Sequence, residues 1–152
     1  ADPLGNAIIL GTEWSRFELS RAAKKVILVA DEIVHTDCMR QFPNLVRIPD
    51  IVVDAVVYWP FAAWPQSSPG FYDVDEDHMR SMNKALAMEE TTQQYLKEYV
   101  FSYQSHRDYL DMIGNETREK ITQTETSFLM NPYRKWILSA DEIAKLVLEG
   151  ER

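Results

Sequence analysis

The sequence is organised around the stretch Ile51–Asp77, IVVDAVVYWPFAAWPQSSPGFYDVDED. Its first part is an apolar run typical of a buried strand, and from Trp59 onward it becomes a loop with three prolines, one glycine and five aromatic residues. It ends in an acidic run that favours a helix N-terminus. Ligands of open α/β proteins bind where buried strands end in loops, so we expect the functional site in this loop.

The segment before this stretch alternates between apolar runs and helical patterns. Ala7–Gly11 and Lys25–Ala30 are predicted strands, and Thr12–Ala23 is a predicted helix that starts at Thr12 or Ser15. This order predicts neighbouring parallel strands, and the continuous apolar run of the second strand predicts cover on both faces.

Two further elements complete this half. A short helix is predicted over Asp37–Phe42, capped by Thr36, and a third strand is predicted over Ile51–Tyr58. Asp54 interrupts that strand, and a lone buried carboxylate is costly, so we expect it to be hydrogen-bonded or to lie at an edge.

The chain after the loop reads as helix. Asp75–Asp77 predict a helix start, a helical stripe follows further on, and Ser105 with Asp108 predicts a capped helix that stops at Gly114. We interpret the stripe as a packing surface; it consists of Tyr95, Leu96, Tyr99, Val100 and Tyr103.

The C-terminal part is predicted to be a polar connector over Glu116–Tyr133, then a helix over Ser139–Leu148 with a capping box at Ser139 and Glu142 that ends at Gly150. We predict that residues 1–114 form an α/β portion and that residues 115–152 belong to the same domain. The expected fold class is an open, mostly parallel α/β sheet followed by a helical part.

Bulk composition excludes several classes of protein. The 152 residues suffice for one domain, and a net charge of −8 without a basic cluster argues against binding to nucleic acid or to an anionic membrane surface. No apolar run approaches the roughly 18 residues of a membrane span. The single cysteine, Cys38, cannot form an internal disulfide and fits a reducing, cytoplasmic location. We predict that it is a buried residue rather than a reactive thiol.

The residues themselves show no catalytic constellation. A calcium loop counted from Asp73 would need Gly and Glu where the chain has His78 and Lys84, and the three histidines are too far apart in sequence to predict a zinc site. Ser67 and Ser68 could bind an oxygen-rich ligand, although paired serines in loops are usually solvated turns. No phosphate-binding glycine motif and no nucleophile-elbow motif occurs.

Four stretches resemble the C-terminal half of the A-type subunit of the heteromeric family I CoA-transferases, of the glutaconate CoA-transferase type. They are the opening turn ADPLGN at residues 1–6, AAKKVILV at 22–29 with EIV at 32–34, Ile48-Pro49 with VDAVV at 53–57, and the loop Pro60–Asp75, which aligns without gaps. The resemblance continues through Tyr95–Gly114 and so covers most of the chain.

The resemblance implies an open, Rossmann-like α/β sheet in an enzyme built from two types of subunit, A and B. Such enzymes move CoA between a thioester and a free carboxylate through a glutamyl-CoA thioester, and the glutamate lies on the B-type subunit. This chain would supply no catalytic residue and no permanently bound cofactor, because the coenzyme A thioester is a substrate. It would shape the acyl pocket at the interface of the two subunits through Ala62, Ala63, Trp64, Pro65 and Ser67, and the N-terminal half of the A-type subunit is expected to be missing.

The loop also departs from the family pattern. Ala62 replaces a Gly, Trp64 a His, Ser68 a Cys and Pro69 a Tyr. Indole only donates a hydrogen bond, whereas imidazole can also accept one or carry charge. The departure leaves open a hydrolase on the same scaffold, which would open rings of bulky CoA-linked substrates, and a non-catalytic binding module.

Overall fold

The structure is a computed structural model that describes residues 1–12, 14–122 and 133–149. These residues form two compact units, each of which is described by itself. The first comprises residues 1–62 with the described C-terminal residues, and the second comprises the described residues of the range Ala63–Thr126. That residues 1–114 and 115–152 belong to one domain stays a prediction.

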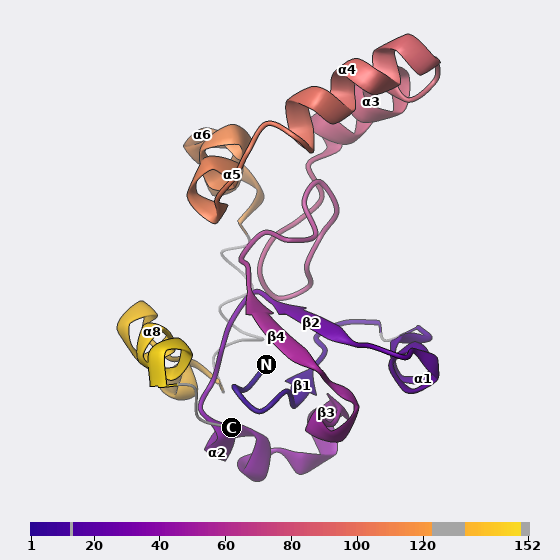
Figure 1. The fold of residues 1–152 in the computed structure, drawn as a ribbon. Coiled ribbons are helices and arrows are strands. Elements are labelled where there is room, and N and C mark those ends of the chain that lie inside the picture. The colour runs from indigo at the N-terminus through magenta and orange to yellow at the C-terminus, as the bar shows by residue number, and fades with distance from the viewer. Residues whose placement is uncertain (13, 123–132, 150–152) are drawn as a thin grey trace. The chain divides into compact units, whose positions relative to one another are not determined.

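The first unit contains two small sheets. β2 (Ile27–Ala30) and β4 (Ala55–Tyr58) are parallel neighbours, with Ile27 opposite Ala55 and Ala30 opposite Tyr58 (Figure 1). β1 (Ala7–Ile8) pairs with β3 (Val46–Ile48) in an antiparallel sheet. The parallel pair confirms the α/β class, in a mixed form with very short strands.

The prediction that the first two strands are neighbours was wrong, because β1 pairs with β3 and not with β2. The turn before β1 explains this pairing. The side-chain oxygen of Asn6 accepts a hydrogen bond from the backbone N–H of Asp50, at 3.1 Å. This bond ties the residue before β1 to the turn after β3, in agreement with the antiparallel register that places Ala7 opposite Ile48.

Asp54 directly precedes β4, so the third strand is shorter than predicted. The residues Asp50–Val52 form a 3-10 helix instead. The Asp54 carboxylate is exposed and accepts hydrogen bonds from Lys25 Nζ, at 2.6 Å, and from the backbone N–H of Val26, at 2.8 Å. The expectation that this carboxylate is hydrogen-bonded is therefore confirmed.

The helices of the first unit begin close to their predicted positions. α1 spans Arg16–Ala22 and follows Ser15, although the Ser15 side chain makes no capping hydrogen bond. α2 spans Thr36–Gln41, but its cap is His35, because Nδ1 of His35 accepts from the backbone N–H of Asp37 at 3.2 Å. The predicted cap by Thr36 was wrong, since Thr36 is already the first helical residue.

The core of the first unit joins α2 to the chain that precedes α8 (Ala140–Glu149). Cys38 is fully buried among Val34, Met39 and Tyr133, which confirms that it is a core residue. The backbone N–H of His35 donates to the carbonyl of Trp136 at 2.7 Å, so this C-terminal segment runs along the residues before α2. The capping box of α8, Ser139 with Glu142, is also confirmed, and Gly150 lies outside the described residues.

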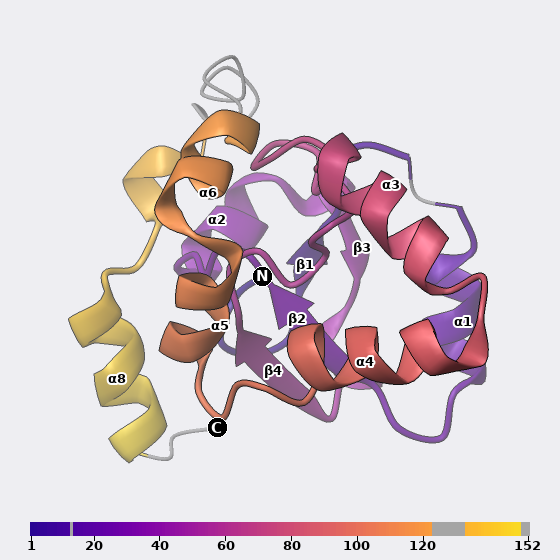
Figure 2. The ribbon, with the colours of Figure 1, turned by 90° about the horizontal axis from the view of Figure 1, so that it is seen from above.

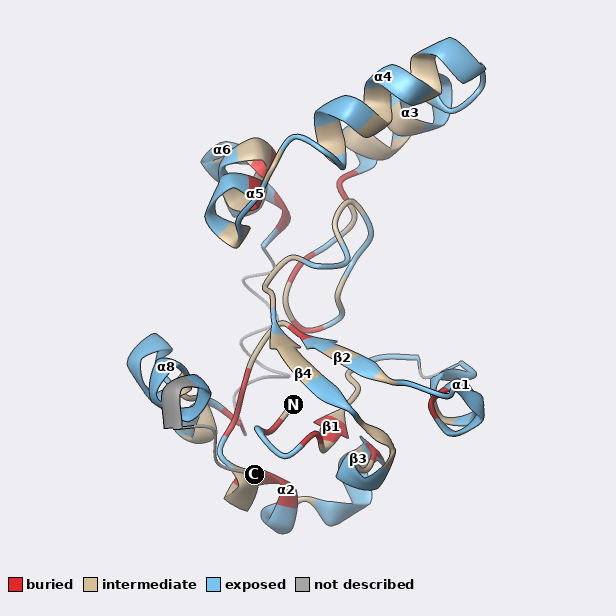
Figure 3. Cartoon of the chain, viewed as in Figure 1, coloured by how far each residue is buried: buried red, intermediate tan, exposed pale blue. Residues whose placement is uncertain are grey.

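One face of β2 is open in the described part of the chain. Ile27 is 67% exposed and Val29 is 51% exposed, and the two side chains share a face because they are two residues apart (Figure 3). The expected cover on both faces of this strand is not found among residues 1–12, 14–122 and 133–149.

The second unit is built from helices. α3 (Glu76–Ala85) and α4 (Glu89–Tyr99) lie side by side as a helical hairpin, and α5 (His106–Ile113) leads into α6 (Asn115–Ile121) (Figures 1 and 2). The predicted helix start at Asp75–Asp77 is confirmed, with Asp75 as the cap of α3, and α5 has the predicted capping box of Ser105 and Asp108 and ends at Gly114. The predicted polar connector begins with α6, and residues 123–132 lie outside the described ones.

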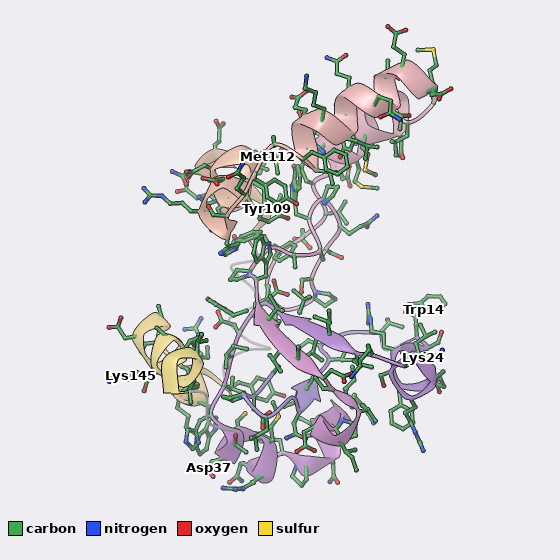
Figure 4. The ribbon with its side chains drawn as sticks, in the orientation of Figure 1. Trp14, Lys24, Asp37, Tyr109, Met112 and Lys145 are labelled. Atoms are coloured by element: carbon green, nitrogen blue, oxygen red, sulfur yellow. The ribbon has the colours of Figure 1, made fainter. Side chains whose placement is uncertain are left out.

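The predicted packing stripe is confirmed in part. Tyr95 and Tyr99 stack with ring centroids 4.8 Å apart, and Tyr103 packs on Tyr109 of α5, labelled in Figure 4, at 5.0 Å. Val100, the residue that follows the end of α4, is 42% exposed and so does not belong to a buried packing surface. None of the described helices is long and apolar enough to cross a membrane.

Candidate functional site

The loop starts where the parallel strands β2 and β4 end. Phe61 has a positive φ of 65°, which is uncommon for a residue other than glycine. Its N–H donates to the carboxylate of Asp31 at 3.0 Å, and Asp31 directly follows β2. The end of one strand therefore fixes the unusual backbone of the loop that leaves the other.

This strand end is acidic. Burial, and then the nearby charge of Asp31, raises the pKa of the Glu32 carboxyl. Burial also raises the pKa of Tyr58, with further contributions from Glu32 and Asp31. These groups lie close enough to interact and favour the neutral form of Tyr58.

Tyr72 anchors the middle of the loop in the second unit. Its side chain is 1% exposed, and its hydroxyl accepts the backbone N–H of Ala63 at 2.9 Å. Ser68 N–H donates to the carbonyl of Tyr72, and Asp73 N–H donates to the carbonyl of Ile121. The loop is thus tied both to itself and to the end of α6.

Asp75 holds the loop at a second point, and it does so with three groups. One carboxylate oxygen, Oδ1, accepts the N–H of His78 at 3.0 Å and caps α3, whereas Oδ2 accepts the indole N–H of Trp64 at 3.1 Å. Its own N–H donates to the carbonyl of Pro65 at 3.0 Å. The Asp75 side chain is buried, and the Trp64–Pro65 peptide bond is cis.

An aromatic cluster supports the indole of Trp64. The ring of Trp64 lies 4.1 Å from the ring of His78, which in turn lies 4.6 Å from Tyr99. His78 Nε2 and the hydroxyl of Tyr95 are hydrogen-bonded at 2.8 Å. Burial lowers the pKa of His78 and raises the pKa of Tyr95, so the pair is neutral near pH 7.

The structure divides the five residues predicted to line an acyl pocket. Ala62 is exposed and belongs to the first unit, where its N–H donates to the carbonyl of Trp59; the other four belong to the second unit. There Ala63 and Ser67 are exposed, and Trp64 and Pro65 are half-buried. That they line one pocket stays a prediction.

Sequence reasoning missed the residues that hold this loop. Asp75 was expected only as part of a helix start, and nothing predicted the contacts of Tyr72 or the hydrogen bond between His78 and Tyr95. A signal existed, because a half-buried indole needs an acceptor, and Asp75 lies at the helix start that follows the loop. The pairing of His78 with Tyr95 depends on how α3 packs against α4, which helical spacing alone does not give.

The acidic run after Asp73 forms ion pairs with neighbouring basic side chains. Asp77 is exposed and pairs with Lys120 at 2.8 Å and with Arg80 at 3.2 Å, and these contacts lower its pKa. No group of three His, Cys, Asp or Glu side chains within the described ranges could hold a metal ion.

Comparison with known proteins identifies relatives of this chain. No family model matches it. An uncharacterized protein of Archaeoglobus fulgidus is 39% identical over 126 residues, which are 82% of this chain and 28% of that protein. The A-type subunit of glutaconate CoA-transferase from Acidaminococcus fermentans is 32% identical over 114 residues, which are 75% of this chain and 36% of that protein.

The fold agrees with the sequence comparison. The crystal structure of glutaconate coenzyme A-transferase from Acidaminococcus fermentans matches with a TM-score of 0.77 at 30% identity, over 82% of this chain and 39% of the other. The chain is therefore homologous to part of the A-type subunit of glutaconate CoA-transferase, which confirms the resemblance. It spans only 28% and 36% of the two curated relatives.

Proposed function

We propose that this chain is part of the A-type subunit of a heteromeric acyl-CoA:carboxylate CoA-transferase. The observation that carries the proposal is the homology to the corresponding subunit of glutaconate CoA-transferase, supported by a fold match at 30% identity. In this proposal a B-type partner subunit supplies the glutamate that accepts CoA. Acyl-CoA and a free carboxylate are the substrates, and no cofactor is permanently bound.

The loop would contribute the wall of the acyl pocket. Ala63 and Ser67 expose small side chains, and the neighbouring Trp64 is held by Asp75 and the aromatic cluster. A wall that is fixed before the substrate arrives loses little conformational entropy on binding, which favours selective recognition. We therefore assign Ala62, Ala63, Trp64, Pro65 and Ser67 to substrate binding and no residue of this chain to catalysis.

Trp64 also favours a second candidate, a CoA-thioester hydrolase that opens rings on the same scaffold. The only hydrogen-bonding group of its indole is already directed at Asp75, so the side chain presents a broad apolar surface rather than a polar group. Such a surface suits a bulky acyl group. Hydrolysis of the thioester would transfer the acyl group to water and release free CoA without an acceptor acid, whereas ring opening would add water across a ring bond and leave the thioester intact.

The test is co-expression of the full-length protein with the B-type subunit encoded by a neighbouring gene. The purified complex is then assayed for CoA exchange between acetyl-CoA and glutaconate. Transferase activity requires the acceptor, whereas a thioester hydrolase releases CoA in its absence and a ring-opening hydrolase changes the mass of the acyl-CoA by one water. A chain that forms no complex with a B-type subunit but binds CoA alone would instead be a binding module. Since the proposed reaction uses soluble thioesters, we also propose a cytoplasmic location.

Trp64→His tests the role of the loop in this complex, with Trp14→His as its control. Trp14 is 82% exposed and lies in the first unit beside α1 (Figure 4). We expect Trp64→His to change the ratio of kcat/KM between propionate and glutaconate as acceptors from acetyl-CoA, and Trp14→His to leave it unchanged. Equal ratios in the wild type and in both variants would show that the loop is only scaffold.

A further inference from the structure

Asp75 does more in this unit than cap a helix. Its two carboxylate oxygens have different partners, the N–H of His78 for Oδ1 and the indole N–H of Trp64 for Oδ2. An N-cap needs only one acceptor oxygen, which serine, asparagine or aspartate can provide. The second oxygen of Asp75 is therefore available for a task that the helix does not require.

We propose that Asp75 is a positioning residue that sets the acyl selectivity of the loop by holding the indole of Trp64 in one orientation. This inference rests on the proposed function, because it assigns a role to a residue of the same acyl pocket. It names a residue that does not need to touch the substrate and acts through another side chain.

Three contacts restrict the indole from different sides. Asp75 holds its N–H, His78 packs against its ring with centroids 4.1 Å apart, and Tyr99 lies 6.4 Å away at the edge of the same cluster. The backbone next to Trp64 is restricted as well, because the N–H of Asp75 donates to the carbonyl of Pro65, the residue that follows Trp64. An indole ring is large and flat, so a change of its rotamer would change the shape of any pocket that it lines.

The hydrogen bond to Asp75 distinguishes the rotamers of Trp64, whereas stacking does so less strictly. Ring contacts between aromatic side chains tolerate offset and tilted geometries. A buried carboxylate that accepts an N–H is directional, and the loss of this acceptor would leave the indole N–H half-buried without a partner. The orientation of Trp64 is thus expected to depend on Asp75.

Asp75→Ser separates the two roles of the carboxylate. Serine is a good N-cap and can accept the N–H of His78 through its single hydroxyl oxygen, but it has no second oxygen for Trp64. Trp64→Phe is the reciprocal variant, because it keeps an aromatic ring and removes the indole N–H. Ser105→Ala is the control, since it removes an N-cap from α5 in the same unit and leaves both partners of Trp64 in place.

The variants are tested in the full-length complex with two readouts. The first is the 19F NMR spectrum of protein labelled with 5-fluorotryptophan, in which Trp64→Phe assigns the Trp64 resonance. The second is the ratio of kcat/KM for propionate and glutaconate as acceptors from acetyl-CoA. We expect Asp75→Ser to shift the Trp64 resonance and to change the ratio about tenfold. The double variant with Trp64→Phe should change the ratio no further than the larger single effect.

The outcomes separate this inference from the proposed function. A wild-type complex that transfers CoA, with an Asp75→Ser ratio equal to that of the wild type and of Ser105→Ala, overturns the positioning role and leaves the proposed function intact. An unshifted Trp64 resonance in Asp75→Ser overturns it as well. Failure of the wild-type complex to transfer CoA overturns the proposed function, and with it the assignment of selectivity.

Discussion

Replacing Asp2 should destabilise the first unit severely, because its carboxylate organises the turn before β1. The side chain is 0% exposed and accepts hydrogen bonds at both oxygens. Oδ1 accepts the backbone N–H groups of Leu4, Gly5 and Asn6, at 3.1, 3.0 and 2.8 Å. Oδ2 accepts the side-chain amide of Asn6 at 3.1 Å, and the other end of that amide binds Asp50.

The magnitude follows from these partners. A hydrogen bond to a charged group contributes about 1.5–3 kcal/mol, but the released backbone groups of an opened turn can bind water, so the individual contributions do not simply add. We expect Asp2→Ala to lower the free energy of unfolding by about 3–5 kcal/mol, out of the roughly 5–15 kcal/mol of a typical domain. Asp2→Asn keeps the three backbone contacts and should cost about 1–2 kcal/mol.

Urea unfolding of the purified protein, followed by tryptophan fluorescence, measures both variants. Asp54→Ala is the matched control, because Asp54 also accepts two hydrogen bonds but is exposed, and it should cost less than about 1 kcal/mol. If Asp2→Ala were no more destabilising than Asp54→Ala, the turn would not be held by the buried carboxylate, and the reasoning would be refuted.

Three further predictions concern Gly5, Cys38 and His78. Gly5 has a φ of 108°, and an added Cβ would lie 3.0 Å from Cβ of Val53, so Gly5→Ala should lower the free energy of unfolding by about 1–3 kcal/mol in the same assay. Cys38 is fully buried and burial raises its pKa, so a thiol reagent should modify the native protein much more slowly than the urea-unfolded protein; equal rates would contradict the buried position. Burial lowers the pKa of His78, so the imidazole takes up a proton more readily in the unfolded chain than in the folded one. The contribution of His78 to the free energy of unfolding should therefore be constant above pH about 6.5 and should fall as the pH decreases below that value. His78→Gln should show a smaller fall between pH 7.5 and 5.5, and an NMR titration that gives His78 an ordinary or raised pKa would contradict the prediction.

Local signals in the sequence predicted the helices well. The start of α5 is marked by the capping box of Ser105 and Asp108, and its end is marked by Gly114. The start of α3 is marked by Asp75. Such caps depend only on neighbours within four residues, so the sequence contains all the information that they need. His35 was missed as the cap of α2 because a histidine ring acceptor is uncommon in this position.

Strand pairing was harder to predict, because it depends on contacts between distant residues. The length of the chain between β1 and β2 allows a parallel crossover, and the pairing of β1 with β3 depends on contacts between residues some forty positions apart. The apolar runs at Lys25–Ala30 and Ile51–Tyr58 predicted two strands, β2 and β4, but did not predict that these two strands pair.

The candidate site was predicted as a loop and not as an arrangement of side chains. Composition and resemblance indicated residues 60–75, but the partner of Trp64 is eleven residues away, and the stack of Trp64 on His78 requires the loop to fold back onto α3. The chemistry of the glutamate lies on another chain in the proposed function, so no pattern within this sequence could have revealed it.

The central claim, transfer of CoA through a glutamyl-CoA thioester on the partner subunit, has a direct test. The full-length complex is incubated with acetyl-CoA, treated with borohydride and digested for mass spectrometry. We predict that one glutamate of the B-type subunit is reduced to the alcohol, only when acetyl-CoA is present, and that no glutamate of this chain is changed. An active complex in which no glutamate of the partner subunit is labelled would contradict the account.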